Sequence, residues 1–195
     1  MYIPNSFSAT DESALDLIEL IGFGQLISIV EDHIEVSYLP VLLDREKKTL
    51  VTHAAKLNPH TQALSLNSKV TMTFLGPHGY ISPSWYTQNS VPTWNYQAVE
   101  VKGEVRVVND EQELHTLVSK MSRFYENRHT NGAWDAQYNQ TMLKHIVGIE
   151  ISINSIQGKF KLSQNKSNED VQRVIHKLEE NGQYSLSQAM FKQLP

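Results

Sequence analysis

The sequence contains no cysteine, which excludes disulfide bonds, thiolate metal ligands and a cysteine nucleophile. No apolar run approaches the roughly 20 residues that a membrane-spanning helix needs. The first residues carry neither a basic segment nor an apolar one, so a secretory signal is not expected. From these absences we expect a cytoplasmic protein with no membrane segment.

An excess of positive charge is also missing. The chain has 17 Lys and Arg against 21 Asp and Glu, which gives a formal net charge of −4. Proteins that grip DNA duplexes usually cluster Lys and Arg to neutralise phosphates. The densest basic run here, residues 45–48, is interrupted by an acid and is typical of a solvated turn. DNA or a DNA-binding partner therefore stays an open alternative that charge does not support.

The familiar catalytic and nucleotide-binding motifs are absent as well. Gly22 and Gly24 begin like a dinucleotide-binding loop, but Ile27 stands where the third glycine belongs and the pair ends a predicted helix. Neither G-x-S-x-G nor H-E-x-x-H occurs. The eight histidines are dispersed, so we predict no metal site and identify no catalytic residue.

Hydrophobic periodicity predicts the secondary structure. Helices are expected over residues 11–21, 110–125, 134–145, 170–181 and 185–192. Strands are expected over residues 24–30, 34–44, 49–54, 70–74, 99–107 and 146–160, with a turn at 76–79. This order favours a mainly antiparallel sheet or barrel with peripheral helices, an α+β protein. No repeat or linker divides it, so we expect one domain over 1–195 with C-terminal helices over about 168–195.

Residues 80–96, YISPSWYTQNSVPTWNY, concentrate aromatic rings and small hydrogen-bonding side chains. Five of these seventeen residues are aromatic, although aromatics make up only 9% of the chain. One interpretation is barrel core plus dimer interface, where aromatics are favoured. The other is a slot for a planar ligand with a polar edge, such as the isoalloxazine ring of FMN.

Two other segments supply the cations that a ribityl phosphate requires. THAAKLNP (52–59) contains His53 and Lys56, and GKFKLSQN (158–165) contains Lys159 and Lys161 followed by polar residues. His53 is equally interpreted as a strand histidine bonded to a neighbouring carbonyl. Lys159 is interpreted as a surface residue, and Gln164 as either a cofactor ligand or a helix cap.

Several motifs together resemble the PaiB-type family of FMN-binding negative transcriptional regulators. These are HAAKLNP, GPHGYISPSWY, VPTWNY and GKFKLSQN, with MYIPNSF and SYLPVLLD also similar, so the resemblance spans nearly the whole chain. It implies an FMN-binding split β-barrel like that of pyridoxamine-phosphate oxidases, which dimerises and holds FMN at the subunit interface. One departure is Thr61, which stands where the family's tryptophan is expected.

The resemblance and the residue chemistry together give one set of expected cofactor-binding residues. They are His53, Ala54, Lys56, Ser82, Ser84, Trp85, Thr93, Trp94, Asn95, Lys161 and Gln164. The implied function is that of a transcriptional repressor acting as a flavin-bound homodimer. The alternative is an FMN-dependent oxidoreductase or flavin reductase that uses NAD(P)H. The C-terminal helices are expected to pack, because the second one is too poor in charge for a DNA-reading helix.

Overall fold

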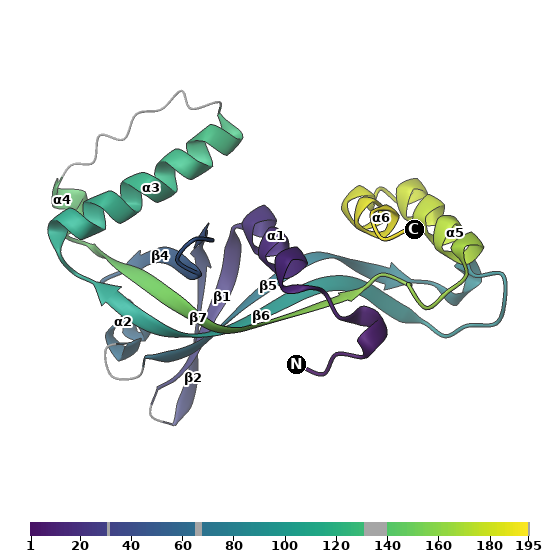
Figure 1. The fold of residues 1–195 in the computed structure, drawn as a ribbon, viewed down its shortest axis with the longest axis horizontal. Coiled ribbons are helices and arrows are strands. Elements are labelled where there is room, and N and C mark those ends of the chain that lie inside the picture. The colour runs from purple at the N-terminus through teal and green to yellow at the C-terminus, as the bar shows by residue number, and fades with distance from the viewer. Residues whose placement is uncertain (31, 65–67, 131–139, 195) are drawn as a thin grey trace. The chain divides into compact units, whose positions relative to one another are not determined.

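The computed structural model describes residues 1–30, 32–64, 68–130 and 140–194 (Figure 1). Its strands form a seven-stranded sheet in the order β2-β1-β5-β6-β7-β4-β3, with antiparallel pairing. The strands are β1 (Phe23–Val30), β2 (His33–Pro40), β3 (Leu42–Asp44), β4 (Thr49–Ala55), β5 (Lys69–Ile81), β6 (Thr93–Val108) and β7 (Ile146–Lys161). The predicted architecture, a sheet with peripheral helices, is confirmed.

The helices are α1 (Asp11–Ile21), α2 (Pro59–Leu64), α3 (Glu111–His129), α4 (Gln140–Leu143), α5 (Asn168–Glu180) and α6 (Tyr184–Phe191), with 3₁₀ turns η1 (Asn5–Phe7) and η2 (Pro83–Trp85). Helices α1, α3, α5 and α6 lie close to where periodicity placed them, whereas α2 was not predicted. The helix predicted over 134–145 falls partly on residues 131–139, which lie outside the described residues. Of its remainder only α4 is helical.

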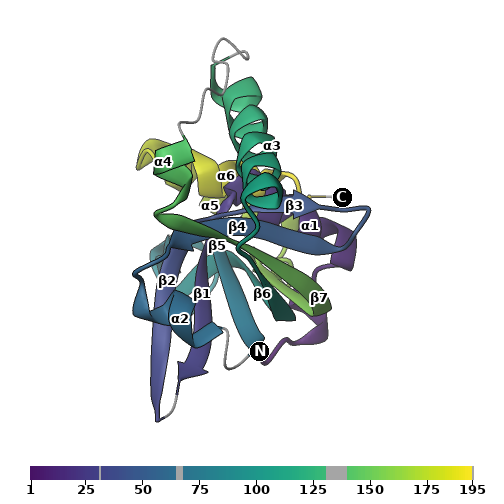
Figure 2. The same ribbon diagram turned by 90° about the vertical axis from the view of Figure 1, so that its left-hand side faces the viewer.

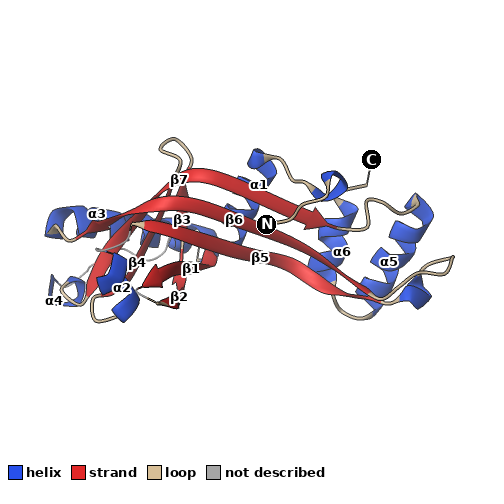
Figure 3. Cartoon of the chain, turned by 90° about the horizontal axis from the view of Figure 1, so that it is seen from below, coloured by secondary structure: helices blue, strands red, loops and turns tan. Residues whose placement is uncertain are grey.

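The turn predicted at residues 76–79 is wrong, because β5 continues through it to Ile81. Figure 3 shows β5, β6 and β7 as long strands running side by side. The two glycines make room for close neighbours instead of a turn. A Cβ on Gly76 would lie 2.9 Å from Leu17 Cδ1, and one on Gly79 would lie 2.3 Å from Gln183 Oε1. A glycine in a sequence can therefore mark a place where another segment lies close to the strand, and not only a turn.

The strand predicted over 34–44 is interrupted at Val41, after Pro40. The backbone N–H of Val41 donates to the carbonyl oxygen of Gly22 at 2.8 Å, so it leaves the ladder that β1 and β2 form. Gly22 itself adopts φ 62°, a left-handed conformation that favours glycine at the end of α1.

The described chain divides into two compact units, each built from several segments. Unit 1 comprises residues 1–17, 75–99 and 157–195, and unit 2 comprises residues 18–74 and 100–156. Strands β5, β6 and β7 contribute to both units. The single-domain assignment made from the sequence stays a prediction.

In unit 2, helix α3 lies over strand β4 (Figure 2). Its apolar stripe packs against buried residues of β3, β4 and β6. Asp110 caps the helix, because its carboxylate accepts from the N–H groups of Gln112 and Glu113 at 3.0 and 2.9 Å. The buried cluster consists of Leu42, Val51, Val108, Leu114, Leu117, Val118, Met121 and Leu143. Both the helix and its cap follow from the sequence pattern.

In unit 1, the C-terminal helices α5 and α6 lie side by side (Figure 1). Ser167 caps α5 through a hydrogen bond from the N–H of Asp170 at 3.2 Å. Leu186 and Met190 of α6 are 2% and 0% exposed. This short helix therefore packs against the rest of unit 1, as its low charge predicts.

Candidate functional site

In unit 1, three of the predicted cofactor residues line one small polar pocket. Thr93 and Asn95 come from the start of β6 and Lys161 from the end of β7, and the pocket measures about 160 Å³. Tyr86, Ser163 and Lys166 also line it. The residues come from segments nearly 70 positions apart, so the fold, and not sequence proximity, assembles this group.

Lys161 is the central cation of the pocket. Its Nζ donates to the carbonyl oxygen of Trp94 at 2.7 Å and also to the hydroxyl of Thr93. Burial lowers the pKa of Lys161, and the nearby charges of Lys159 and Lys166 lower it further. No described carboxylate forms an ion pair with Lys161, so its charge is compensated only by neutral oxygens. An anionic ligand would stabilise this ammonium group.

The two neighbouring lysines lie against aromatic rings. Lys166 Nζ is 4.8 Å from the ring centre of Tyr86, and Lys159 Nζ is 5.6 Å from that of Tyr96. Trp94 is 55% exposed and meets Tyr80 edge to face, with ring centres 6.3 Å apart. Unit 1 thus combines three lysines with exposed flat rings.

Asn95 is 1% exposed, and its amide is only partly satisfied. Its Nδ2 donates to Ser163 Oγ at 2.9 Å and approaches Met190 Sδ at 3.4 Å, whereas its buried Oδ1 has no hydrogen-bond partner. A buried unpaired acceptor is costly, and groups of this kind concentrate at functional sites. Ser163, beside it, adopts φ 67°, which is unusual for a residue with a side chain.

The remaining predicted residues of unit 1 do not line this pocket. Ser82 Oγ accepts from Ser84 N at 3.2 Å and caps the 3₁₀ turn η2, and the carbonyl oxygen of Trp85 accepts from Arg173 Nε at 3.2 Å. Gln164 uses both ends of its amide on the backbone at the end of β7, at Phe160 O in the strand and at Leu162 N just after it. These contacts fix local backbone around the pocket.

The other predicted residues, His53, Ala54 and Lys56, belong to unit 2. His53 is half-buried on β4, its Nδ1 is buried with no hydrogen-bond partner, and burial lowers its pKa. Its ring is therefore not satisfied by a neighbouring carbonyl at Nδ1. Ala54 is buried, and Lys56 is exposed just after the strand, with its N–H bonded to His145 O at 2.8 Å.

Unit 2 also contains a buried network that the sequence did not reveal. His60 is 1% exposed, and its ring nitrogens contact Ser28 Oγ at 2.8 Å and Ser37 Oγ at 2.9 Å. Asn58 joins the network through its side chain, with Nδ2 donating to Ser37 Oγ at 3.1 Å. The network fastens the start of α2, and the loop that carries Lys56, to strands β1 and β2. In the sequence, the one indication of this network was the histidine that follows Asn58 and Pro59.

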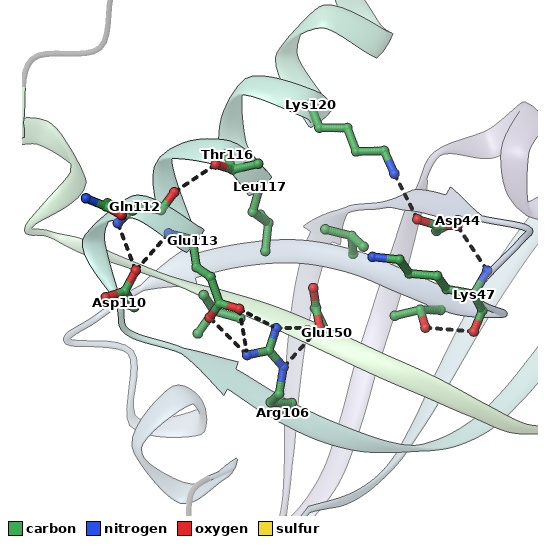
Figure 4. A pocket seen from close by; sticks show the side chains of 13 residues that line it. Asp44, Lys47, Arg106, Asp110, Gln112, Glu113, Thr116, Leu117, Lys120 and Glu150 are labelled. Atoms are coloured by element: carbon green, nitrogen blue, oxygen red, sulfur yellow. Dashed lines mark hydrogen bonds and ion pairs between the residues drawn. The ribbon is translucent and has the colours of Figure 1, made fainter.

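Unit 2 also has a hollow of about 450 Å³ under the first turns of α3 (Figure 4). Five of the charged residues that line it pair with each other. Arg106 bridges Glu113 and Glu150 at 3.0 and 2.8 Å, and Lys120 contacts Asp44 at 2.8 Å. These pairs form without a ligand, so the hollow is a weaker candidate for a cofactor site than the unit 1 pocket.

Within the described residues, no group of histidine, cysteine, aspartate or glutamate is arranged to hold a metal ion. In the same part of the chain, no helix is long and apolar enough to cross a membrane.

The fold is similar to that of several solved proteins. It superposes on the flavocytochrome Anf3 from Azotobacter vinelandii with a TM-score of 0.63 at 14% identity, covering 84% of this chain and 74% of that one. The FAD and heme binding protein from Mycobacterium smegmatis gives a TM-score of 0.63 at 14% identity, covering 86% and 80%. The expected fold class, the pyridoxamine-phosphate-oxidase-like split barrel, is confirmed.

Sequence comparison narrows the class to a family. Residues 1–155 match the family described as "Putative FMN-binding domain". The chain is also 32% identical over 185 residues to the "Protease synthase and sporulation protein PAI 2" of Bacillus subtilis (strain 168), covering 92% of this chain and 89% of that protein. The chain belongs to this FMN-binding family, and its expected PaiB-type membership and its expected cofactor, FMN, are confirmed.

The residues present fit the cofactor. FMN needs cations for its phosphate and flat apolar surface for its ring, and Lys161 and Trp94 offer both in unit 1. The pocket of about 160 Å³ is large enough for a phosphate group but too small for an isoalloxazine ring. The flat flavin ring would instead lie against exposed aromatic side chains. The unpaired Oδ1 of Asn95 and Nδ1 of His53 mark two places where a polar ligand would relieve an unsatisfied atom.

Proposed function

We propose that this protein is a cytoplasmic, flavin-bound homodimer that represses transcription. The arrangement around Lys161 supports the flavin part: a partly desolvated ammonium group, for which the described residues offer no ion-paired carboxylate, lines a small polar pocket. We assign the phosphate end of FMN to Lys161, Thr93 and Asn95, and the ring to Trp94.

Further predicted residues have supporting roles in this proposal. His53, Ala54 and Lys56 of unit 2 provide a second group of cofactor contacts, with Lys56 as an exposed point charge. Ser82, Ser84, Trp85 and Gln164 maintain the backbone that presents the pocket. The bound flavin supplies redox chemistry and light absorption. The protein residues bind it, orient it and neutralise its phosphate.

The regulatory part of the proposal is supported by one relative. The Bacillus subtilis relative is named for protease synthesis and sporulation. The net charge of −4, together with the packing of α6, argues against direct contact with a duplex, so we assign the repression to action through another protein.

A deletion and complementation experiment tests this function. The gene is deleted in its own organism and restored as wild type or as Lys161→Ala, and transcripts are sequenced. We expect one set of transcripts to rise on deletion, to fall again with the wild type, and to stay high with the variant. If no transcript rises on deletion, the repressor assignment is wrong.

The purified protein distinguishes the flavin reductase alternative. Under anaerobic conditions, NADH and NADPH are each added to the FMN-loaded protein and the flavin absorbance is followed. The regulator proposal expects no bleaching faster than that of free FMN under the same conditions. Rapid bleaching that air reverses would instead support the reductase.

A further inference from the structure

The hollow under the first turns of α3, in unit 2, combines charged walls with a buried apolar surface (Figure 4). It measures about 450 Å³, which lies within the range of small-molecule sites. Its apolar surface is formed by Val51 of β4, Val108 of β6 and Leu117 of α3, all of which are buried. Of the described residues that line the hollow, none was predicted to bind the cofactor. The hollow is therefore a separate cavity, and its own chemistry defines what it can hold.

One side of the hollow carries more positive than negative charge. Lys120 Nζ contacts the carboxylate of Asp44 at 2.8 Å, and the backbone N–H of Lys47 donates to the same carboxylate at 3.1 Å. Figure 4 shows the Lys47 side chain extending from the turn after β3 into the hollow. Within the described part of the chain, no carboxylate forms an ion pair with its ammonium group. One carboxylate thus stands against two ammonium groups, and we call these three residues the lysine side.

The other side of the hollow carries more negative than positive charge. Arg106 of β6 bridges Glu113 of α3 and Glu150 of β7 at 3.0 and 2.8 Å. One guanidinium group thus stands against two carboxylates, and we call these three residues the glutamate side. Arg106 bonds to Glu150 through Oε2, so Oε1 remains able to accept from another donor. Asp110, which also lines the hollow, uses its Oδ1 to cap α3.

These charges favour one kind of ligand. A ligand with a single charge is attracted by one side of the hollow and repelled by the other, whereas a zwitterion is attracted by both. The ion pairs of Lys120 and Arg106 form without a ligand, so binding has less side-chain order to create. The buried apolar surface favours a ligand whose body is also apolar, because removing apolar area from water is favourable.

We propose that this hollow binds a small zwitterion with an apolar body, the chemistry that free apolar amino acids and short apolar peptides share. The carboxylate of the ligand binds Lys47, and its ammonium group binds Glu150 Oε1. Its apolar side chains lie on Val51, Val108 and Leu117. FMN has no ammonium group for the glutamate side, so this hollow does not compete with the unit 1 pocket for the cofactor. The inference goes beyond the proposed function and depends on none of its cofactor residues.

Isothermal titration calorimetry on the purified protein tests this inference. The probes are leucine, Leu-Leu and Leu-Ala-Leu, each in its free form, with an acetylated amino group, and with an amidated carboxyl group. We expect a free form to bind, and each capped form of it to bind about fivefold more weakly, the upper range for a charge pair that water still reaches. The free probe that binds most tightly identifies an amino acid or a peptide as the source. Absence of binding by all three at about 5 mM, enough to detect a Kd of about 1 mM, would overturn the inference.

Two variants test the two charged sides separately. In Lys47→Met, the free probe should bind as weakly as its amidated form, while acetylation should still weaken binding about fivefold. In Glu150→Gln, which keeps an acceptor for Arg106, this pattern should be reversed. Lys48→Met is the matched control, because Lys48 is the next exposed residue of the same turn and does not line the hollow, so its affinities should stay within about twofold of wild type. Equal effects of the two lysine variants, or equal binding of free and capped probes by wild type, would overturn the inference.

Flavin absorbance, recorded on the same samples, keeps this inference separate from the proposed function. A protein that binds the zwitterion but takes up no FMN leaves the inference standing and removes the flavin proposal. A protein that binds FMN but none of the probes does the reverse. Release of flavin during the titration would place the probe in the cofactor site and would overturn the inference.

Discussion

Lys161 Nζ donates a hydrogen bond to the main-chain carbonyl oxygen of Trp94 at 2.7 Å, across 67 residues of sequence. The contact connects the end of β7 to the start of β6. It leaves the ammonium group partly desolvated, with no described acidic partner, at the edge of a small polar pocket. A phosphate group would supply the missing counter-charge. Lys161 is therefore the first residue to mutate.

Replacing Lys161 with Ala should weaken FMN binding. The loss of a charge-assisted phosphate contact costs about 1.5–3 kcal/mol, which corresponds to about 10–150-fold in Kd. Titration of FMN into the apoprotein, followed by flavin fluorescence, measures this change. Riboflavin, which lacks the phosphate, should bind wild type and variant alike.

Lys192→Ala is the control, because it removes the same charge from an exposed position after α6 of the same unit. Its Kd for FMN should stay within about twofold of wild type. Equal losses for the two variants would mean that only net charge matters, which would contradict the assigned role of Lys161.

Asn95→Ala should destabilise the fold. The variant loses the hydrogen bond to Ser163 Oγ and leaves that buried hydroxyl with one fewer partner, at a cost of about 1–3 kcal/mol. Urea unfolding followed by circular dichroism measures this as a lower midpoint with an unchanged slope. Ser90→Ala, which affects a half-buried hydroxyl on the same pocket, should change stability by less than about 0.5 kcal/mol. A wild-type midpoint for Asn95→Ala would show that its buried hydrogen bonds contribute no net stability.

His60 should make the fold less stable in mild acid. Burial lowers its pKa, although the charge of Glu35 partly opposes this. The unfolded chain, with a histidine pKa near 6.5, therefore binds more protons than the folded one. Stability from His60 is complete above about pH 6.5 and is lost as pH falls toward the lowered pKa. His53, whose pKa burial also lowers, contributes in the same direction.

Urea midpoints at several pH values between 5 and 8 check this dependence. His60→Gln should lower stability at pH 8, because two serine contacts are disturbed, but should flatten the decline toward pH 5. Asp44 and Asp170, with lowered pKa values, lose their contributions only at more acidic pH, below their usual value near 3.9. An unchanged decline in His60→Gln would rule out His60 as its source.

Tyr125→Phe should loosen the end of α3. The Tyr125 hydroxyl lies 2.6 Å from both Gly22 O and Val41 O and accepts from Val41 N at 3.2 Å. Its single proton is donated to only one carbonyl at a time, so the substitution should lower the free energy of unfolding by about 1–2 kcal/mol. We expect faster amide hydrogen exchange around residues 22 and 41. Phe124→Leu, an apolar change at the adjacent position, should leave exchange at those amides unaffected.

Much of the fold was predictable because its signals are local. The alternation of valines after Val99 and the stripe with its Asp110 cap identified β6 and α3, and the structure confirms both. The predictions were wrong where one sequence pattern is compatible with two different structures. Gly76 and Gly79 resemble a turn, but they make room within β5 for Leu17 and Gln183, which lie far away in sequence.

The candidate site was predictable in kind but not in detail. The sequence indicated Lys161, Thr93 and Asn95 as polar residues of a cofactor site, and the structure gathers them at one pocket. It could not indicate that Gln164 turns back onto β7, or that His60 is buried between two serines. Hydrogen-bond partners of polar side chains depend on which strands become neighbours.

By itself, the sequence determined the class of protein, its cofactor and most strands and helices, because periodicity, helix caps and motifs are formed by residues that lie close together in the sequence. Tertiary structure alone decided which polar atoms stay unpaired, as at Asn95 Oδ1, and which charges line the same hollow, as under α3. The physical reason is that burial and pairing are properties of segments brought together by folding. No single segment carries them.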